Sequence, residues 1–345
     1  MKLKLSFFAF NCRFNYFGFI LSIVLLSLTS LNVLSQSPVV PAAKLSPEVL
    51  PGNGLSKFDF FYAGEAKEEN MYIIKNGKIA WSYSHPVPKG EISDAVLLSN
   101  MNVLFAHQFG VTEISADKKV VWNYDAPEGF EIHTAQPIGL DKVIFIMNGN
   151  PAKAIIMKKS TNEVIKEIAL LVGNATSTHG QFRHARLSDK GTYVVAQMDM
   201  GKVCEYDSNG KVLLTIDAPG VWSAEPLKNG NILITTRDYV REINRKLETV
   251  WEYTLNNIPD YSFKMPQVAL RLSNGNTIIN NWFNLWNGPV DAENATVQAI
   301  EVTPDKKIIW ALREWSEPVN LGPSTIIIPL SEPRTNENAF FGDIK

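Results

Sequence analysis

Residues 111–122 read VTEISADKKVVW, and the same phrase returns as VREINRKLETVW at residues 240–251 and as AIEVTPDKKIIW at residues 299–310. In all three copies an apolar residue stands two positions before a Glu, a polar turn follows, and a Trp stands nine positions after the Glu. Partial copies end at Trp81 and at Leu214, which replaces the Trp. A phrase that recurs along the whole chain indicates a repeat architecture.

A second repeated phrase begins with Ala and continues through a turn into an apolar strand. Its best copies contain LKNGNILI at residues 227–234 and LSNGNTII at residues 272–279, and residues 98–103 are a looser version. Asn-Gly between apolar alternations is a strong hairpin signal. We therefore expect type I′ turns there, with positive φ at both central residues.

The two phrases share one register. Aligning them brings five alanines into line at spacings of 40, 50, 39 and 45 residues: Ala95, Ala135, Ala185, Ala224 and Ala269. Such a period, filled with four short strands, is typical of propeller blades. The alignment predicts five complete blades, whose inner strands begin near Ser93, His133, Arg183, Trp222 and Gln267.

The ends of the repeat are incomplete in complementary ways. Residues 58–62, 71–74 and 78–83 supply three strands without an inner one, and residues 325–330 supply an inner strand with nothing after it. An open solenoid would instead need capping repeats. We therefore predict an all-β, six-bladed β-propeller of four-stranded antiparallel blades over residues 58–330. Its last blade is closed by the C-terminal strand, which hides the sheet edges.

The repeated Trp and Glu are interpreted as structural residues. We expect each Trp to pack between neighbouring blades and to donate its indole N–H to a local carbonyl. Each Glu is expected to accept a hydrogen bond from a turn amide or a neighbouring N–H. These carboxylates are spread around the ring, so they do not form a paired acid and base.

The N-terminal segment has the pattern of a secretory signal peptide. Two lysines among the first four residues precede a nearly continuous apolar run at residues 17–28, and Ser35 is a small residue before a plausible cleavage site. An uncleaved anchor is the alternative, although Arg13 interrupts an apolar span of about 20 residues. The predicted order is a signal peptide (1–35), a linker (36–57), the propeller (58–330) and a tail (331–345) of a secreted or periplasmic protein.

Composition excludes several classes of protein. The 345 residues include 33 Lys and Arg against 35 Asp and Glu, so no nucleic-acid partner is expected, because that affinity comes mostly from basic residues. The 45% of apolar and 20% of charged residues exclude wholesale disorder. Cys204 is the only cysteine after the predicted cleavage site, which excludes an internal disulfide there. We expect a monomer with no membrane span after cleavage.

The Glu-x5-Lys-x2-Trp units, together with the Leu-x-Asn-Gly-Asn strand starts, resemble a degenerate tryptophan-docking repeat of the PQQ-like (quinoprotein-like) β-propeller superfamily. Within it, the chain most resembles the arylsulfotransferase-like secreted bacterial propellers. The fuller Ala-x-Asp-x2-Thr-Gly-x3-Trp repeat and the adjacent cysteines of quinoprotein dehydrogenases are absent. The resemblance therefore implies the fold, and we expect no quinone or other cofactor.

One rim of the predicted channel gathers polar residues, because each inner strand begins there and each second strand ends there. Functional groups of propellers collect on such a rim. The candidate ligand-binding residues are Glu131, His133, Arg183, His184, Trp222, Arg237, Gln267, Asn281 and Trp282. Residues 281–294, which lengthen the fifth blade, are either an aromatic sugar platform or a loop folded over the channel.

Two interpretations of this rim remain open. Arginines and histidines could bind a small anionic or carbohydrate ligand, since the guanidinium fork suits sulfate, phosphate and carboxylate and a Trp could stack on a sugar. Alternatively, the strand starts are polar only because they border a wet channel, and the protein is a non-catalytic interaction scaffold.

The candidate catalytic residues follow from the resemblance. In an arylsulfotransferase-like transferase, one histidine would carry the sulfuryl group while an Arg and a second His stabilise oxygen charge, and His133 and His184 beside Arg183 are the candidates. A polysaccharide lyase or hydrolase using a His with Tyr or Glu131 is the other enzymatic option. No His-x-His or His-x3-His pair occurs, so no metal centre is predicted.

Overall fold

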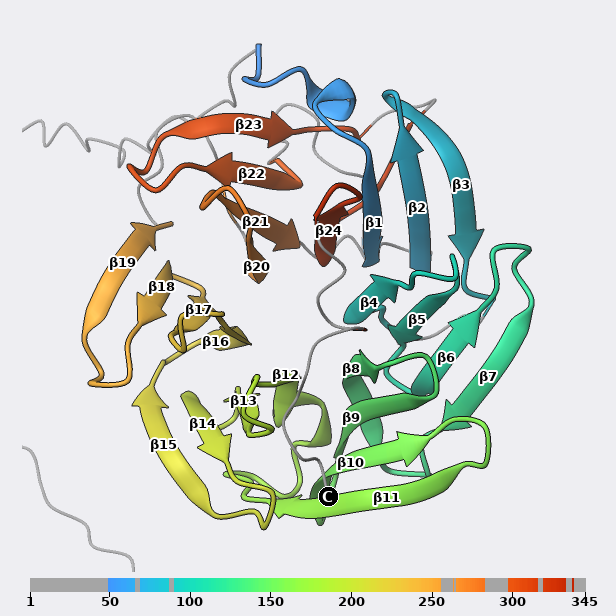
Figure 1. The fold of residues 1–345 in the computed structure, drawn as a ribbon, viewed down its shortest axis with the longest axis vertical. Helices are drawn as coiled ribbons and strands as arrows, with labels where there is room; N and C mark the ends of the chain where they lie inside the picture. The colour runs from blue at the N-terminus through green and yellow to red at the C-terminus, as the bar shows by residue number, and fades with distance from the viewer. Residues whose placement is uncertain are drawn as a thin grey trace, which may run out of the picture. The chain divides into compact units, whose positions relative to one another are not determined.

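The computed structural model describes residues 49–65, 69–86, 90–255, 263, 265–282, 297–315, 319–332 and 337. These residues form six four-stranded antiparallel sheets arranged around a common centre, as Figure 1 shows. The predicted six-bladed β-propeller is therefore confirmed. The predicted signal peptide, most of the linker and the tail, and residues 283–296 of the fifth-blade insertion lie outside the described residues.

The blades are numbered here by their innermost strand. Blade 1 contains β4 (Asp94–Leu97), β5 (Val103–Ala106), β6 (Gly110–Ile114) and β7 (Val120–Asp125). Blade 2 contains β8 (Glu131–Ile138), β9 (Lys142–Asn148), β10 (Ala152–Lys158) and β11 (Glu163–Leu170). Blade 3 contains β12 (Phe182–Leu187), β13 (Tyr193–Gln197), β14 (Lys202–Tyr206) and β15 (Val212–Asp217).

The remaining blades follow the same order. Blade 4 contains β16 (Val221–Pro226), β17 (Ile232–Thr236), β18 (Tyr239–Ile243) and β19 (Thr249–Thr254). Blade 5 contains β20 (Met265–Arg271), β21 (Thr277–Trp282), β22 (Ala299–Val302) and β23 (Ile308–Leu312). Blade 6 contains β24 (Ile326–Pro329), β1 (Phe60–Glu65), β2 (Glu69–Lys75) and β3 (Lys78–Ser84).

Blade 6 joins the two ends of the propeller. Its strand order is β24-β1-β2-β3, and β24 pairs antiparallel with β1 from Ile326 opposite Ala63 to Pro329 opposite Phe60. The inner strand from the C-terminal side thus completes a sheet begun by three N-terminal strands, as predicted. Pairing of this kind satisfies the backbone groups of β1 that would otherwise form an open edge.

The core lies between neighbouring blades, because each sheet buries both faces near the centre. Every residue of β12 is buried, whereas the outermost strand β7 alternates between exposed and half-buried residues. Between blades 2 and 3, for example, Ile144 and Ile146 belong to one apolar cluster with Phe182 and Tyr193. Each such side chain contributes about 1.5–3 kcal/mol when it is fully removed from water.

The repeated tryptophans link neighbouring segments, as expected. The indole N–H of Trp81 donates to Ala116 O at 2.9 Å, and that of Trp251 donates to Pro304 O at 2.9 Å, in each case in the next blade. Trp122 donates to the side-chain oxygen of Asn162 instead, at 2.7 Å. These bonds satisfy the polar end of a large apolar residue.

The repeated glutamates accept hydrogen bonds from turn side chains of their own blade. Asn102 donates to Glu113 at 2.6 Å, and Asn276 donates to Glu301 at 2.6 Å. Glu113 also forms a buried ion pair with Lys159 of the next blade. The structural interpretation of these glutamates is therefore confirmed.

The prediction of type I′ turns at residues 229–230 and 274–275 was wrong. In each of these two turns only the glycine has positive φ: Gly230 (φ 82°) and Gly275 (φ 88°). The reason is that each loop contains one more residue than a two-residue hairpin. Leu227 O accepts from Gly230 N and Leu227 N donates to Asn231 O, so glycine occupies the left-handed position after an ordinary turn. Asn76 and Gly77, between β2 and β3, do both have positive φ.

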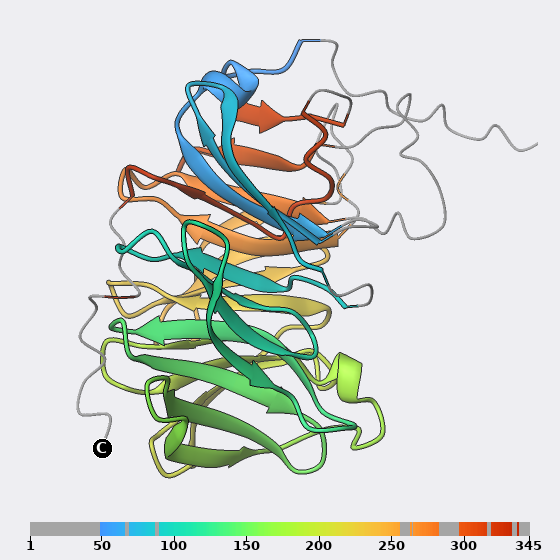
Figure 2. The ribbon, with the colours of Figure 1, turned by 90° about the vertical axis from the view of Figure 1, so that its right-hand side faces the viewer.

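Helical structure is minor in the described residues. It consists of two 3₁₀ turns, η1 (Gly54–Ser56) and η2 (Thr178–Gly180), and neither approaches the length or apolarity of a membrane-spanning helix. η1 lies beside blade 5, where Trp310 donates to Gly54 O at 2.8 Å. η2 interrupts the loop between β11 and β12, and Figure 2 shows it projecting from one side of the disc.

Candidate functional site

Four inner strands are bulged at the same point near one rim of the ring. The register shifts fall between Ile132 and Ala135, between Phe182 and His184, between Val221 and Ser223, and between Pro266 and Ala269. A bulge inserts an unpaired residue and re-aims its side chain, and bulges are enriched beside functional sites. The residues in these bulges include four of the predicted site residues: His133, Arg183, Trp222 and Gln267.

Two adjacent positions have different roles in the inner strands of blades 1 to 4. The residue directly before the aligned Ala bonds to the next blade: Thr134 Oγ1 accepts from Ala185 N at 3.1 Å, and His184 Nδ1 lies 3.2 Å from Ala224 O and 3.4 Å from Ala224 N. The residue two before the Ala instead contacts its counterparts, because successive side chains of a strand point to opposite sides. Ser93, His133 and Arg183 meet in this way around the rim.

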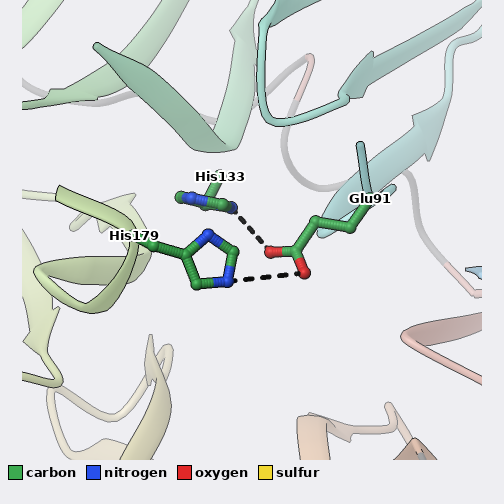
Figure 3. Close-up of side chains that lie close together, drawn as sticks. All are labelled: Glu91, His133 and His179. Carbon is green, nitrogen blue, oxygen red and sulfur yellow. Dashed lines mark ion pairs between the residues drawn. The ribbon is translucent and has the colours of Figure 1, made fainter. Parts of the chain in front are cut away.

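Five side chains near this rim form what we name the mouth cluster: Glu91, Glu131, His133, His179 and Arg183. Its centre is His133, whose Nδ1 lies 2.8 Å from Glu91 Oε1 and whose Nε2 lies 2.8 Å from Glu131 Oε2. Arg183 pairs with the same Glu91 oxygen. His179 completes the group, with Nδ1 2.8 Å from Glu131 Oε2. Its Nε2 lies 4.0 Å from Glu91 Oε2 (Figure 3).

Exposure within the mouth cluster rises from His133 to His179. The His133 side chain is fully buried and Arg183 is 4% exposed, whereas Glu131 is 18% and His179 is 51% exposed. Burial opposes ionisation of Glu131, but hydrogen bonds from His133 and His179 outweigh it and hold its pKa well below the usual range. A molecule arriving from solvent therefore meets His179 and the Glu131 carboxylate first.

Trp222 extends the cluster into blade 4. The Arg183 guanidinium carbon lies 4.8 Å from the centroid of the Trp222 ring, a cation–π contact that restrains Arg183. The indole N–H of Trp222 and the side-chain amide of Gln267 are both buried, and neither has a hydrogen-bond partner within the described part of the chain. Buried donors of this kind are costly unless a partner satisfies them.

Four other charged side chains form a second group, the interblade cluster: Asp94, His184, Arg186 and Glu225. Arg186 binds Asp94 through two hydrogen bonds of 2.7 and 2.9 Å. Arg186 Nε and His184 Nε2 lie 3.3 and 3.1 Å from Glu225 Oε1. Burial opposes ionisation of Asp94, but Arg186 outweighs it and lowers the pKa of that carboxyl. Asp94, His184 and Arg186 are almost fully buried, Glu225 is 18% exposed, and each charged member has a partner within the cluster.

The predicted site residues are thus divided. The structure brings Glu131, His133, Arg183 and Trp222 together, and places His184 in the interblade cluster. Asn281 holds backbone in place, because its side chain donates to Val297 O at 2.8 Å and accepts from Met265 N at 3.2 Å.

Arg237, Gln267 and Trp282, which were also predicted, are not among the five members of the mouth cluster. Arg237 is exposed, and its side-chain stem lies beside Gly220. Gln267 is buried, and Trp282 is half-buried at the end of β21.

The predicted ligand-binding residues did not include Glu91 or His179, although the sequence places Glu91 at the predicted rim and His179 in a loop close to it. Glu91 stands four residues before Ala95, as Glu131 stands four before Ala135, so the shared register was the available signal. His179 lies in the loop of residues 171–181, which accounts for the longest spacing between aligned alanines. No residue pattern indicates where an inserted loop of this kind will place its histidine.

A separate pair of histidines lies at the outer part of the same rim. The rings of His85 and His107 are 4.6 Å apart, and His107 Nε2 lies 3.0 Å from Thr112 Oγ1. Burial first, and then the neighbouring His85, lower the pKa of His107 to about 4. His85 and His107 are not members of the mouth cluster, and burial lowers the pKa of His85 as well.

Comparison with known proteins supports the fold. No protein-family model matches the chain, and no curated protein sequence matches it. A solved protein of unknown function from Bacteroides caccae is 23% identical, with 80% of this chain and 100% of that chain covered and a TM-score of 0.69.

More distant structures have a similar architecture. The WD40 β-propeller domain of Doa1 is 17% identical and has a TM-score of 0.50. The match covers 65% of this chain and 72% of the Doa1 chain. A catalytically inactive virginiamycin B lyase from Staphylococcus aureus, solved with quinupristin, is 12% identical over 74% of this chain and 84% of its own, also with a TM-score of 0.50. The chain is a β-propeller.

Proposed function

We propose that this protein binds a small hydroxyl-rich, carbohydrate-type ligand at the mouth cluster. The observation that carries the proposal is the concentration of two carboxylates, two histidines and an arginine at one rim, next to Trp222. Burying charges costs several kcal/mol per ion, and propeller closure does not require these charges. Clusters of titratable side chains with perturbed pKa values, such as that of Glu131, are enriched at functional sites.

The charge balance of the cluster favours hydroxyl groups over an anion. Arg183, the residue best suited to an anionic group, already pairs with Glu91. An anion would also face the carboxylates of Glu91 and Glu131, which repel it. Sugar hydroxyls both donate and accept hydrogen bonds, so they can bind the carboxylates and His179 at once.

The sulfotransferase alternative gains no support from the site. Its two candidate nucleophiles, His133 and His184, are both fully buried, whereas a nucleophile must reach the transferred group. A lyase or hydrolase acting at the same mouth is better supported. The exposed His179 bonded to Glu131 at 2.8 Å is a pair that could accept and return a proton.

The broader setting is also inferred. The tryptophan contacts between blades support membership of the PQQ-like superfamily. The apolar run at residues 17–28 supports a cleaved signal peptide and a secreted or periplasmic protein. N-terminal sequencing of the mature protein tests the cleavage: a chain that still begins at Met1 would contradict it.

Calorimetric titration tests ligand binding. The panel contains neutral oligosaccharides, uronic-acid oligosaccharides, aryl sulfates and a quinone cofactor. We expect saturable binding of a neutral oligosaccharide, weakened at least 10-fold in Glu131→Gln, which loses a charged acceptor (about 1.4 kcal/mol). The matched control is Glu167→Gln, a half-exposed glutamate on the outermost strand of blade 2, which should bind as the wild type does. Preference for aryl sulfates, or binding indifferent to Glu131→Gln, would overturn the proposal.

A further inference from the structure

Three side chains of the mouth cluster present metal-ligating atoms to one another. One ligand atom each from Glu91, His133 and His179 lies within 4.8 Å of the other two, although the residues come from three separate segments. In Figure 3 both imidazoles face the Glu91 carboxylate. We propose that these residues bind a divalent transition-metal ion such as Zn²⁺. The proposal rests on the proposed function, because the ion would take part in binding the same ligand.

Glu131 prepares both histidines for this role. Its Oε2 lies 2.8 Å from His133 Nε2 and 2.8 Å from His179 Nδ1, so one carboxylate oxygen can accept an N–H from each ring. With those nitrogens protonated, the lone pairs of His133 Nδ1 and His179 Nε2 are on the Glu91 side. Metal-ligating histidines commonly donate their other N–H to a carboxylate in this way, which fixes the tautomer and the ring orientation.

The space between His133 and Glu91 attracts positive charge. His133 Nδ1 and Glu91 Oε1 are 2.8 Å apart, and two acceptors this close require a proton or a cation to bridge them. Two ligands of a tetrahedral Zn²⁺, each about 2.0–2.1 Å from the metal, stand about 3.3 Å apart, so this pair needs little movement. His179 Nε2, which lies 4.0 Å from Glu91 Oε2, must move closer. Arg183 Nη1 and Ser93 Oγ each lie 3.1 Å from His133 Nδ1, and Arg183 also pairs with the same Glu91 oxygen. The ion would replace these contacts, while Arg183 keeps its stacking on Trp222.

The ligand set indicates which ions fit. Two imidazoles and one carboxylate suit Zn²⁺, Co²⁺ or Ni²⁺, whereas Mg²⁺ and Ca²⁺ prefer oxygen ligands alone. Three protein ligands leave the fourth tetrahedral position open, as in binding and catalytic zinc sites. Because His179 is half-exposed, that position faces solvent, where it can accept a hydroxyl oxygen of the ligand.

Titration of the EDTA-treated full chain with ZnCl₂ and CoCl₂ tests the site. We expect one equivalent to bind, with the visible absorption of tetrahedral Co²⁺, and no saturation by MgCl₂. His179→Ala should weaken binding at least 100-fold, and Glu131→Gln, which removes the orienting carboxylate, should weaken it 10- to 100-fold. His179 is half-exposed, so its substitution does not disturb the core.

The matched control is His85→Ala, which removes the other close histidine pair of this rim and should leave the stoichiometry and affinity unchanged. Absence of saturable Zn²⁺ and Co²⁺ binding, or binding that survives His179→Ala, would overturn the metal site. Carbohydrate titrations in EDTA and in Zn²⁺ separate the two proposals. Sugar binding without any metal binding leaves the proposed function standing, and metal binding without any sugar binding leaves only the metal site.

Discussion

The mouth cluster and the interblade cluster are built from the same residue types but differ in accessibility. Each contains an Arg, a His and two carboxylates, and their members Arg183 and His184 are neighbours in sequence. Arg183 lies in the bulge between Phe182 and His184, and its side chain joins a different cluster from that of His184. In the interblade cluster every charge has an internal partner, while the mouth cluster adds the half-exposed His179 from an inserted loop. Residue type alone therefore does not distinguish a structural ion network from a binding site.

The largest expected effect on the free energy of unfolding comes from a substitution that disrupts the interblade cluster. Arg186→Leu leaves Asp94 and Glu225 buried without their cation, and we expect a loss of about 3–5 kcal/mol in the free energy of unfolding, measured by urea denaturation. The control is Lys202→Met at the more exposed pair with Asp217, which should cost no more than about 1 kcal/mol.

Adding Asp94→Asn to Arg186→Leu should recover part of that loss, because it removes one of the stranded charges. Equal losses for Arg186→Leu and Lys202→Met would show that the interblade cluster is not a structural network.

A pH titration sharpens the comparison. Burial opposes ionisation of Asp94 and Glu225, but Arg186 lowers the pKa of both below the ordinary values of 3.8 and 4.5. Their contribution to stability is present above pH 4.5 and is lost as the pH falls, since the unfolded chain then binds more protons than the folded one. Thermal unfolding between pH 3 and 7 should show this decline, and Glu225→Gln should make it shallower. A slope unchanged by Glu225→Gln would contradict the assignment.

The smallest expected effect on stability is that of a substitution in the mouth cluster. His179→Ala should change the free energy of unfolding by no more than about 0.5 kcal/mol, because its side chain is half-exposed and outside the core. The same variant should lose metal and ligand binding, so stability and binding separate at this residue. A large destabilisation without loss of binding would assign His179 to the fold.

The propeller architecture could be predicted from the sequence because each blade repeats the same residue pattern at a similar spacing. The Trp at a fixed distance after the Glu, the aligned alanines and the complementary ends predicted the blade count and the closing strand β24. The rim was also predictable, since polar residues gather where inner strands begin.

The sequence did not predict which rim residues join the mouth cluster and which join the interblade cluster. A bulge shifts the alternation of side chains by one residue, and no sequence pattern predicts the bulge between Phe182 and His184. From the sequence alone, Arg183 and His184 therefore look equivalent as candidate site residues. The partnership of Glu91 with His179 joins residues 88 positions apart, one of them in an inserted loop, and only the folded chain brings them together.

The pairing of β24 with β1 also has a consequence for biosynthesis. Translation delivers Phe60–Glu65 long before Ile326–Pro329, so the earliest strands wait with an unpaired edge until β24 has been made. Premature termination anywhere before Ile326 leaves a protein that cannot seal itself and exposes a strand prone to aggregation. The propeller can therefore close only in a chain that has been translated past β24.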